Sequence, residues 1–251
     1  MDSSYKYYVL SYVISTTFAD VQTTFLCQMV FMLPIWAVHS EEGYYWKLFG
    51  ISAHWSVVLW YIGLAFQLAT LCFCYLKKHE TLVKLTADRV FELSHRSNLV
   101  IMLIITTFFV MMVYWFTGMK IEINEQYMIV QTMYPSLLAK FEELTNFALY
   151  DRSINLYSFL AVGAICQVLV AMLIITLTCH MLYVLRSNLR IFSLRTLKKH
   201  QTALYSLLAQ TSTYACIMFP LSCGAIAVFS KLDNVSNIML IKSITIFSKT
   251  H

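Results

Sequence analysis

The sequence predicts an all-α membrane protein, a polytopic bundle of transmembrane helices. Of its 251 residues, 59% are hydrophobic and only 12% are charged, about half the charged fraction of a typical soluble domain. The apolar residues form runs long enough to cross a bilayer, and they do not alternate with polar residues as barrel strands do. Because only helices and closed barrels span lipid, these runs predict helices.

Six apolar segments form a single predicted transmembrane domain over residues 1–251. Five are full spans, at 8–38, 52–76, 98–118, 155–185 and 202–230. The sixth, 238–251, is a partial span, because its apolar part is shorter than the ~20 residues that the hydrocarbon layer requires. Pro34 and Pro220 are the expected kink points of the first and fifth spans.

A short basic loop between the fourth and fifth spans orients the chain. It contains five basic residues and no acid: Arg186, Arg190, Arg195, Lys198 and Lys199. Lys and Arg concentrate in loops on the cytoplasmic side of a membrane. With this loop inside, the cytoplasmic segments hold eleven basic residues and the outer ones five. The N-terminus of the chain is therefore expected to lie inside.

The other charge and motif patterns exclude several function classes. The net charge of +5 comes mostly from two cytoplasmic loops, so it does not indicate nucleic-acid binding. No zinc-protease, phosphate-loop or hydrolase motif is present, and we expect neither a catalytic residue nor an enzyme. All seven cysteines fall within apolar spans, without metal-ligand spacing. We expect no metal site and no cofactor.

Polar residues recur at helical spacing in three spans, of which the fifth carries Ser206, Gln210 and Thr213 ahead of Pro220. Those of the first span share a face with Cys27: Thr16, Thr17, Asp20, Thr23, Thr24 and Gln28. The second span repeats the pattern with Ser56, Gly63, Gln67, Thr70 and Cys74. We expect these faces to point into the bundle. Hydrogen bonding between helices explains each Thr or Gln. Asp20 is either structural or an intramembrane ion site, proton site or polar switch.

The outer loops carry two further features. Asn234 begins an Asn-Val-Ser glycosylation sequon, but its closeness to two spans makes it a weak acceptor. In the loop 119–154, six apolar residues between Leu137 and Ala148 have helical spacing. They predict an amphipathic helix that covers the outer mouth or lies on the membrane.

Several blocks of the sequence resemble the nematode serpentine chemoreceptors of the Srh and Sri classes, and Sri most closely. They include F-A-D-V-Q-T-T-F-L at 18–26, C-F-C-Y-L-K-K-H at 72–79, and S-L-R-T-L-K-K-H-Q at 193–201 followed by S-L-L-A-Q at 206–210. The resemblance implies a seven-helix G-protein-coupled receptor. Aligned with it, the five full spans correspond to helices two to six, and the last span to part of helix seven. We therefore expect a truncated receptor that lacks its first helix, through a gene-model error, a pseudogene or a real truncation.

The resemblance also implies a chemosensory function in signal transduction. A small molecule would bind from outside among candidate residues of several spans: His54, Trp55, Gln67, Tyr114, Trp115, Tyr157 and Tyr214. The aromatic members equally suit a membrane-interface belt. A heterotrimeric G protein would meet Lys77, Lys78, His79 and the loop Arg186–Lys199. The expected location is the plasma or ciliary membrane of a sensory cell.

Two other functions stay open. A transporter or channel could use Asp20 on its path, although the sequence shows no inverted repeat and no matching pair of broken spans. The chain could also be a non-functional receptor fragment.

Overall fold

The structure is a computed structural model, and it describes residues 3–32, 35–40, 42–85, 95–151, 153–187, 196, 198–212 and 215. Its elements are α1 (Ser3–Val21), the π-helix η1 (Gln22–Cys27), β1 (Val30–Phe31), β2 (Ala37–His39), α2 (Tyr44–Phe49), α3 (Ala53–Leu85), α4 (His95–Thr117), α5 (Ile123–Met133), the 3₁₀-helix η2 (Pro135–Leu137), α6 (Leu138–Glu142), β3 (Phe147–Leu149) and α7 (Ile154–Ser187). A further helix covers 198–212. The chain divides into two compact units.

Three helices in the described ranges are long and apolar enough to cross a membrane: Ala53–Lys84, Arg96–Thr117 and Ile154–Ser187. They confirm the predicted fold class and cover the predicted spans 52–76, 98–118 and 155–185. In the most apolar stretch of α3, 72% of the residues are buried by protein, against 11% for α4 and for α7. A helix that leaves its apolar surface uncovered is stable where lipid replaces water around it.

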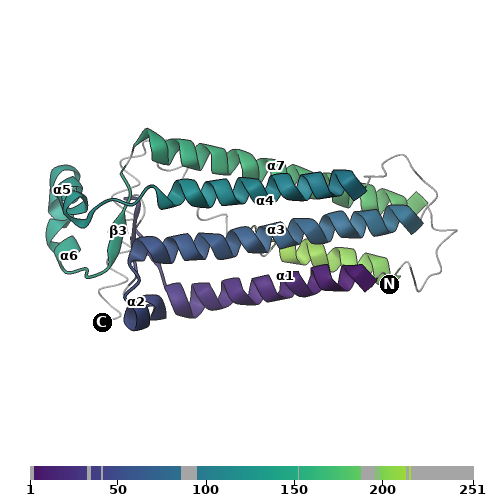
Figure 1. Cartoon of the computed structure of the whole chain (residues 1–251), viewed down its shortest axis with the longest axis horizontal. Helices are drawn as coiled ribbons and strands as arrows, with labels where there is room; N and C mark the ends of the chain where they lie inside the picture. The colour runs from purple at the N-terminus through teal and green to yellow at the C-terminus, as the bar shows by residue number, and fades with distance from the viewer. Residues whose placement is uncertain are drawn as a thin grey trace. The chain divides into compact units, whose positions relative to one another are not determined.

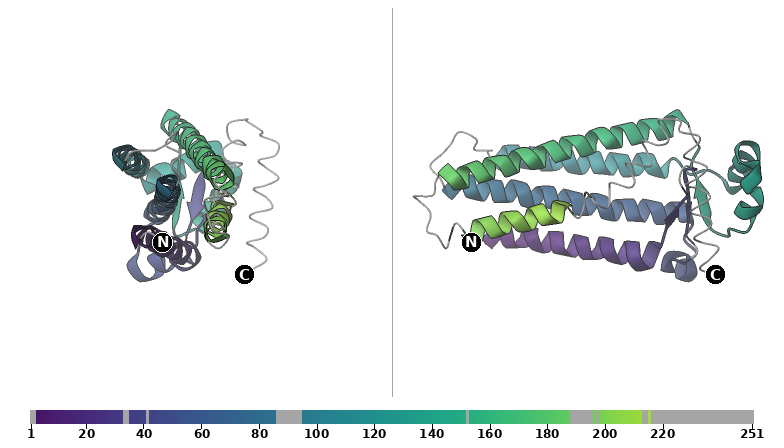
Figure 2. Two further views of the ribbon diagram at one scale, coloured as in Figure 1. Left: turned by 90° about the vertical axis from the view of Figure 1, so that its right-hand side faces the viewer. Right: turned by 180° about the vertical axis from the view of Figure 1, so that it is seen from behind.

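The first unit comprises 1–17, 64–110 and 163–218. Its parts of α1, α3, α4 and α7 run side by side with the helix 198–212 (Figures 1 and 2). The core joins residues from four of these helices, among them Tyr12, Tyr75, Met181 and Leu204, each at most 4% exposed. Leu82 belongs to the same core. Helix α3 therefore continues to Leu85, nine residues beyond the predicted end at 76. Core residues such as Leu82 recur on it after the charged segment 77–80.

Among the described residues, the second unit comprises those of 18–63 and 111–162. Its strands form an antiparallel sheet in the order β1-β2-β3, with Val38 opposite both Phe31 and Ala148. Helices α5 and α6 lie next to β3 (Figure 1). Val130, Phe141 and Phe147 fill the core between them.

The predicted first span, 8–38, is wrong in its last part. The helix ends at Cys27, and Gln28 follows in a left-handed conformation with φ of 40°. A non-glycine residue in this conformation stops a helix, because the next backbone amide no longer meets the helical carbonyls. Pro34, the predicted kink, lies outside the described residues.

The predicted amphipathic helix over 137–148 is also only partly correct. Helix α6 ends at Glu142, and Phe147–Leu149 is a strand paired with β2. Apolar residues at this spacing fit both a helix and a buried strand, and the pairing with β2 decides between them. Helix α5 was not predicted.

Candidate functional site

The second unit contains an open cavity of about 680 Å³. It lies where α3, α5 and α7 begin and α4 ends. Aromatic residues line part of it, namely Trp55, Tyr114, Trp115 and Tyr150. Lys120, Glu125 and Asp151 supply charge of both signs. Pockets that combine aromatic walls with a few polar groups are suited to small organic molecules.

An aromatic stack supports the residues of this cavity. The ring of Phe116 stacks on His54 and on Phe159, at centroid distances of 5.7 and 5.3 Å. His54 Nδ1 lies 3.2 Å from the hydroxyl of Tyr150. Because the hydroxyl is held by His54 and the ring by Phe116, Tyr150 presents a fixed edge to the cavity.

The structure brings together three of the seven predicted ligand residues. Trp55, Tyr114 and Trp115 line the cavity. His54 does not, because it is 4% exposed and packed into the stack. Gln67 belongs to the first unit, where its amide donates to Thr16 Oγ1 at 3.4 Å. Half-buried Tyr157 is not among the lining residues. Tyr214 lies outside the described residues.

A buried asparagine that sequence reasoning missed connects the outer loops. The Asn146 side chain accepts from the Ala53 backbone N–H at 2.7 Å and donates to the Ser40 carbonyl at 2.6 Å. The backbone carbonyl of Asn146 accepts from the Ser40 backbone N–H at 3.1 Å. Gln126 acts similarly, accepting from the Leu149 N–H and donating to the Ile121 carbonyl. These amides tie β2, β3, α3 and α5 together through backbone groups.

In the first unit, polar side chains connect three helices. His79 Nε2 on α3 lies 2.8 Å from His180 Nδ1 on α7. Lys78 Nζ, also on α3, donates to His200 Nδ1 at 3.0 Å and lies 5.1 Å from the ring centre of Tyr5. Burial, with a smaller contribution from the Lys78 ammonium, lowers the pKa of His200 to about 4. His200 is therefore neutral at pH 7 and can accept this hydrogen bond.

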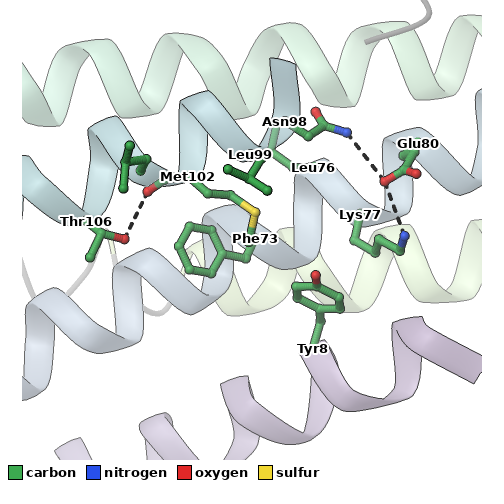
Figure 3. Close-up of a pocket in the computed structure, with 10 residues that line it drawn as sticks. Tyr8, Phe73, Leu76, Lys77, Glu80, Asn98, Leu99, Met102 and Thr106 are labelled. Atoms are coloured by element: carbon green, nitrogen blue, oxygen red, sulfur yellow. Dashed lines mark hydrogen bonds and ion pairs between the residues drawn. The ribbon is translucent and has the colours of Figure 1, made fainter. Parts of the chain in front are cut away.

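A second polar group surrounds Glu80. Its carboxylate accepts from Lys77 at 3.2 Å and from the amide of Asn98 on α4 at 3.4 Å (Figure 3). It also accepts from Lys84 at 2.5 Å. Two ammonium groups and an amide favour the charged form of a carboxyl group that they contact. Glu80 is 7% exposed, so these three partners replace its hydration.

The prediction that Lys78 and His79 face a G protein is wrong for this structure. They are 4% and 2% exposed, because α3 does not end before them and its buried stripe includes them. By contrast, Arg186, Lys198 and Lys199 are exposed; their contact with a G protein stays a prediction. Arg190 and Arg195 lie outside the described residues, as do Pro220 and Asn234.

A family model described as "Serpentine type 7TM GPCR chemoreceptor Sri" matches residues 2–251. The chain belongs to the Sri family of serpentine chemoreceptors. This confirms the predicted resemblance and makes the chain a multi-pass membrane protein of a receptor family rather than an enzyme family. Searches of curated proteins and of solved structures find no significant match.

The polar face of the first span in this Sri receptor points inward only in part. Thr16 and Thr23 accept hydrogen bonds from Gln67 and Trp60 of α3, and Cys27 is fully buried. Asp20 is exposed. The hydroxyl of Thr17 bonds a carbonyl of its own helix at 3.0 Å, so it needs no partner helix. Ser15, outside the predicted face, is fully buried, and its hydroxyl lies 2.8 Å from that of Thr70.

The second-span stripe of the Sri receptor is buried, as predicted: Ser56, Gln67, Thr70 and Cys74 are all at most 6% exposed. In the described ranges, no three His, Cys, Asp or Glu residues come close enough to hold a metal ion. The described residues thus offer the open cavity, the buried contacts of Lys78 and His79, and the polar group around Glu80.

Proposed function

We propose that this Sri receptor binds a small molecule at the cavity of its second unit and signals to a heterotrimeric G protein from its cytoplasmic end. Family membership supports the receptor class. The cavity lined by Trp55, Tyr114, Trp115 and Tyr150 supports the ligand site. The plasma or ciliary membrane of a sensory cell is the corresponding location.

The observation that carries the signalling proposal is the pair of buried contacts from α3. Lys78 reaches His200 on the helix 198–212, and His79 reaches His180 on α7. Both contacts join side chain to side chain, so they can break without loss of any backbone hydrogen bond. A ligand activates the receptor if it binds more tightly to the conformation in which these contacts are broken.

Exposed basic residues next to these contacts supply the proposed G-protein surface. Arg186 lies in the last turn of α7, and Lys198 and Lys199 begin the helix 198–212. Movement of this helix away from α3 would displace the two lysines together with His200. Arg190 and Arg195 belong to the same proposed surface.

The test is the basal rate of nucleotide exchange on a G protein in membranes that contain the receptor. His79→Phe keeps an aromatic ring but cannot bond His180, so it should raise basal exchange severalfold. Tyr205→Phe is the control, since Tyr205 lies on the helix 198–212 and is 62% exposed. Equal basal rates in both variants and the wild type would remove the support for this mechanism.

The transporter alternative has lost its main argument, because Asp20 is exposed rather than facing the bundle. Uptake or current that depends on Asp20 in proteoliposomes would restore it. Surface labelling of intact cells distinguishes the receptor from a retained, non-functional fragment.

A further inference from the structure

We propose that a groove in the first unit binds one acyl chain of an anionic phospholipid from the cytoplasmic leaflet, with the phosphate at Lys77. The groove has a volume of about 410 Å³ and lies between α1, α3 and α4. Its walls are mainly apolar, formed by Phe73, Leu76, Leu99, Met102 and Leu103 (Figure 3). Tyr8, Lys77, Glu80 and Asn98 also line it.

The groove opens toward the side of the bundle that lipid covers. Leu99 and Leu103, which form its α4 wall, are 56% and 62% exposed. Only 11% of the most apolar stretch of α4 is buried by protein. In a membrane this surface is in contact with acyl chains, so a lipid reaches the groove by lateral movement within its leaflet.

The length and depth of the groove match a single leaflet. Its α4 side runs from Asn98 to Thr106, which is about 12 Å at the helical rise. Half of the hydrocarbon layer is about 15 Å thick. Lys77 lies about 36 Å along α3 from Ala53, which is beyond a hydrocarbon layer of about 30 Å. The polar end therefore lies at headgroup depth, and the apolar part follows the acyl region.

The charge at the polar end selects an anionic headgroup. The ion pairs described there join Lys77 and Lys84 to Glu80 alone, an excess of one positive charge. Lys77 gives one hydrogen bond to Glu80, and an ammonium group has three donors, so two remain for phosphate oxygens. Basic pockets between helices on the cytoplasmic side of a membrane bind anionic headgroups in this way.

The site can be tested by photo-crosslinking the purified full chain in nanodiscs. The probes are phosphatidylserine and phosphatidylcholine that carry the same diazirine acyl chain. We expect phosphatidylserine to label the wild type more strongly, at peptides that contain 73–77 or 98–106. Leu103→Trp fills the groove and should reduce this labelling severalfold. Val110→Trp is the matched control, because Val110 lies two turns along the same face of α4 and is 63% exposed.

The headgroup assignment has its own variant. Lys77→Gln removes one positive charge and should reduce the preference for phosphatidylserine about fivefold, whereas Lys77→Arg should retain it. Equal labelling of the Leu103→Trp and Val110→Trp variants would overturn the groove as the site. Equal labelling by the two lipids would overturn the anionic headgroup. Neither readout depends on ligand or G protein, so the lipid site and the proposed function can fail separately.

Discussion

Two pairs of buried polar residues, one pair in each unit of this Sri receptor, bond different kinds of partner. In the second unit, Asn146 and Gln126 bond backbone N–H and carbonyl groups. In the first, His79 and Lys78 bond other side chains, on α7 and on the helix 198–212. Bonds to backbone groups fix loops in one arrangement, whereas contacts between side chains on different helices can be made and broken as helices move. The second unit therefore resembles a fixed frame for a cavity, and the first a switch.

Loss of the Asn146 side chain should have the largest effect on stability. Asn146→Ala leaves the Ala53 N–H and the Ser40 carbonyl buried without this partner, at a cost of about 1–3 kcal/mol each. We expect a large fall in the detergent melting temperature and in surface expression. Asn124→Ala, at an exposed position on α5, should change neither. Equal effects of the two variants would show that the amide does not hold the outer loops.

The cavity should be sensitive to loss of its aromatic walls. Trp55→Ala and Tyr114→Ala should each raise the half-maximal concentration of an activating odorant about tenfold, the effect of losing about 1.4 kcal/mol of binding energy. Calcium responses in transfected cells provide the measurement. Tyr7→Ala is the control, because Tyr7 is 70% exposed on α1. A similar shift with Tyr7→Ala would argue for general damage rather than a binding site.

Acid should weaken the first unit through His200. Burial and Lys78 lower its pKa to about 4 from 6.5, so the unfolded chain binds a proton at a higher pH than the folded one. This contribution to stability is complete above about pH 6.5 and is lost as the pH falls toward about 4. The melting temperature in nanodiscs should fall over this range, and less so in His200→Gln. An unchanged slope in the variant would contradict the assignment.

The smallest effect is expected at Asp20. Its exposure predicts that Asp20→Asn changes the melting temperature and basal signalling only slightly. Ser15→Ala should cost more stability, because it breaks the hydrogen bond to Thr70. The reverse order would support the sequence-based prediction that the Asp20 face points into the bundle.

The sequence was sufficient for the fold class, because long apolar runs have one main explanation in a chain with so little charge. It failed where polarity was used to choose the buried face of α1. A threonine hydroxyl can bond a carbonyl of its own helix, as that of exposed Thr17 does, so polar residues need not face other helices. The buried residues Tyr12, Ser15 and Ala19 include only one polar side chain, so polarity does not mark their face.

The end of α3 shows a second limit. Charges at Lys77 and Lys78 made the segment look like a loop. Leu82 and Val83, one turn further along α3, are nevertheless buried. That spacing is the signal that could have extended the helix. Nothing in the sequence marks Asn146 or His180 as partners, since each meets a residue about 100 positions away. Trp55, Tyr114 and Trp115, which line one cavity, were proposed together because aromatic residues at span ends fit a binding pocket as well as a membrane interface.

The proposed inactive state depends most on the α3–α7 contact between His79 and His180. Its most direct test is basal nucleotide exchange by a His79→Cys/His180→Cys variant, before and after treatment with a short bifunctional thiol cross-linker that reductant removes. We predict high basal exchange without the cross-link, low exchange with it, and recovery on reduction, while the His79→Cys single variant stays unaffected by the reagent. The same rate with and without the cross-link would contradict a switch at this contact.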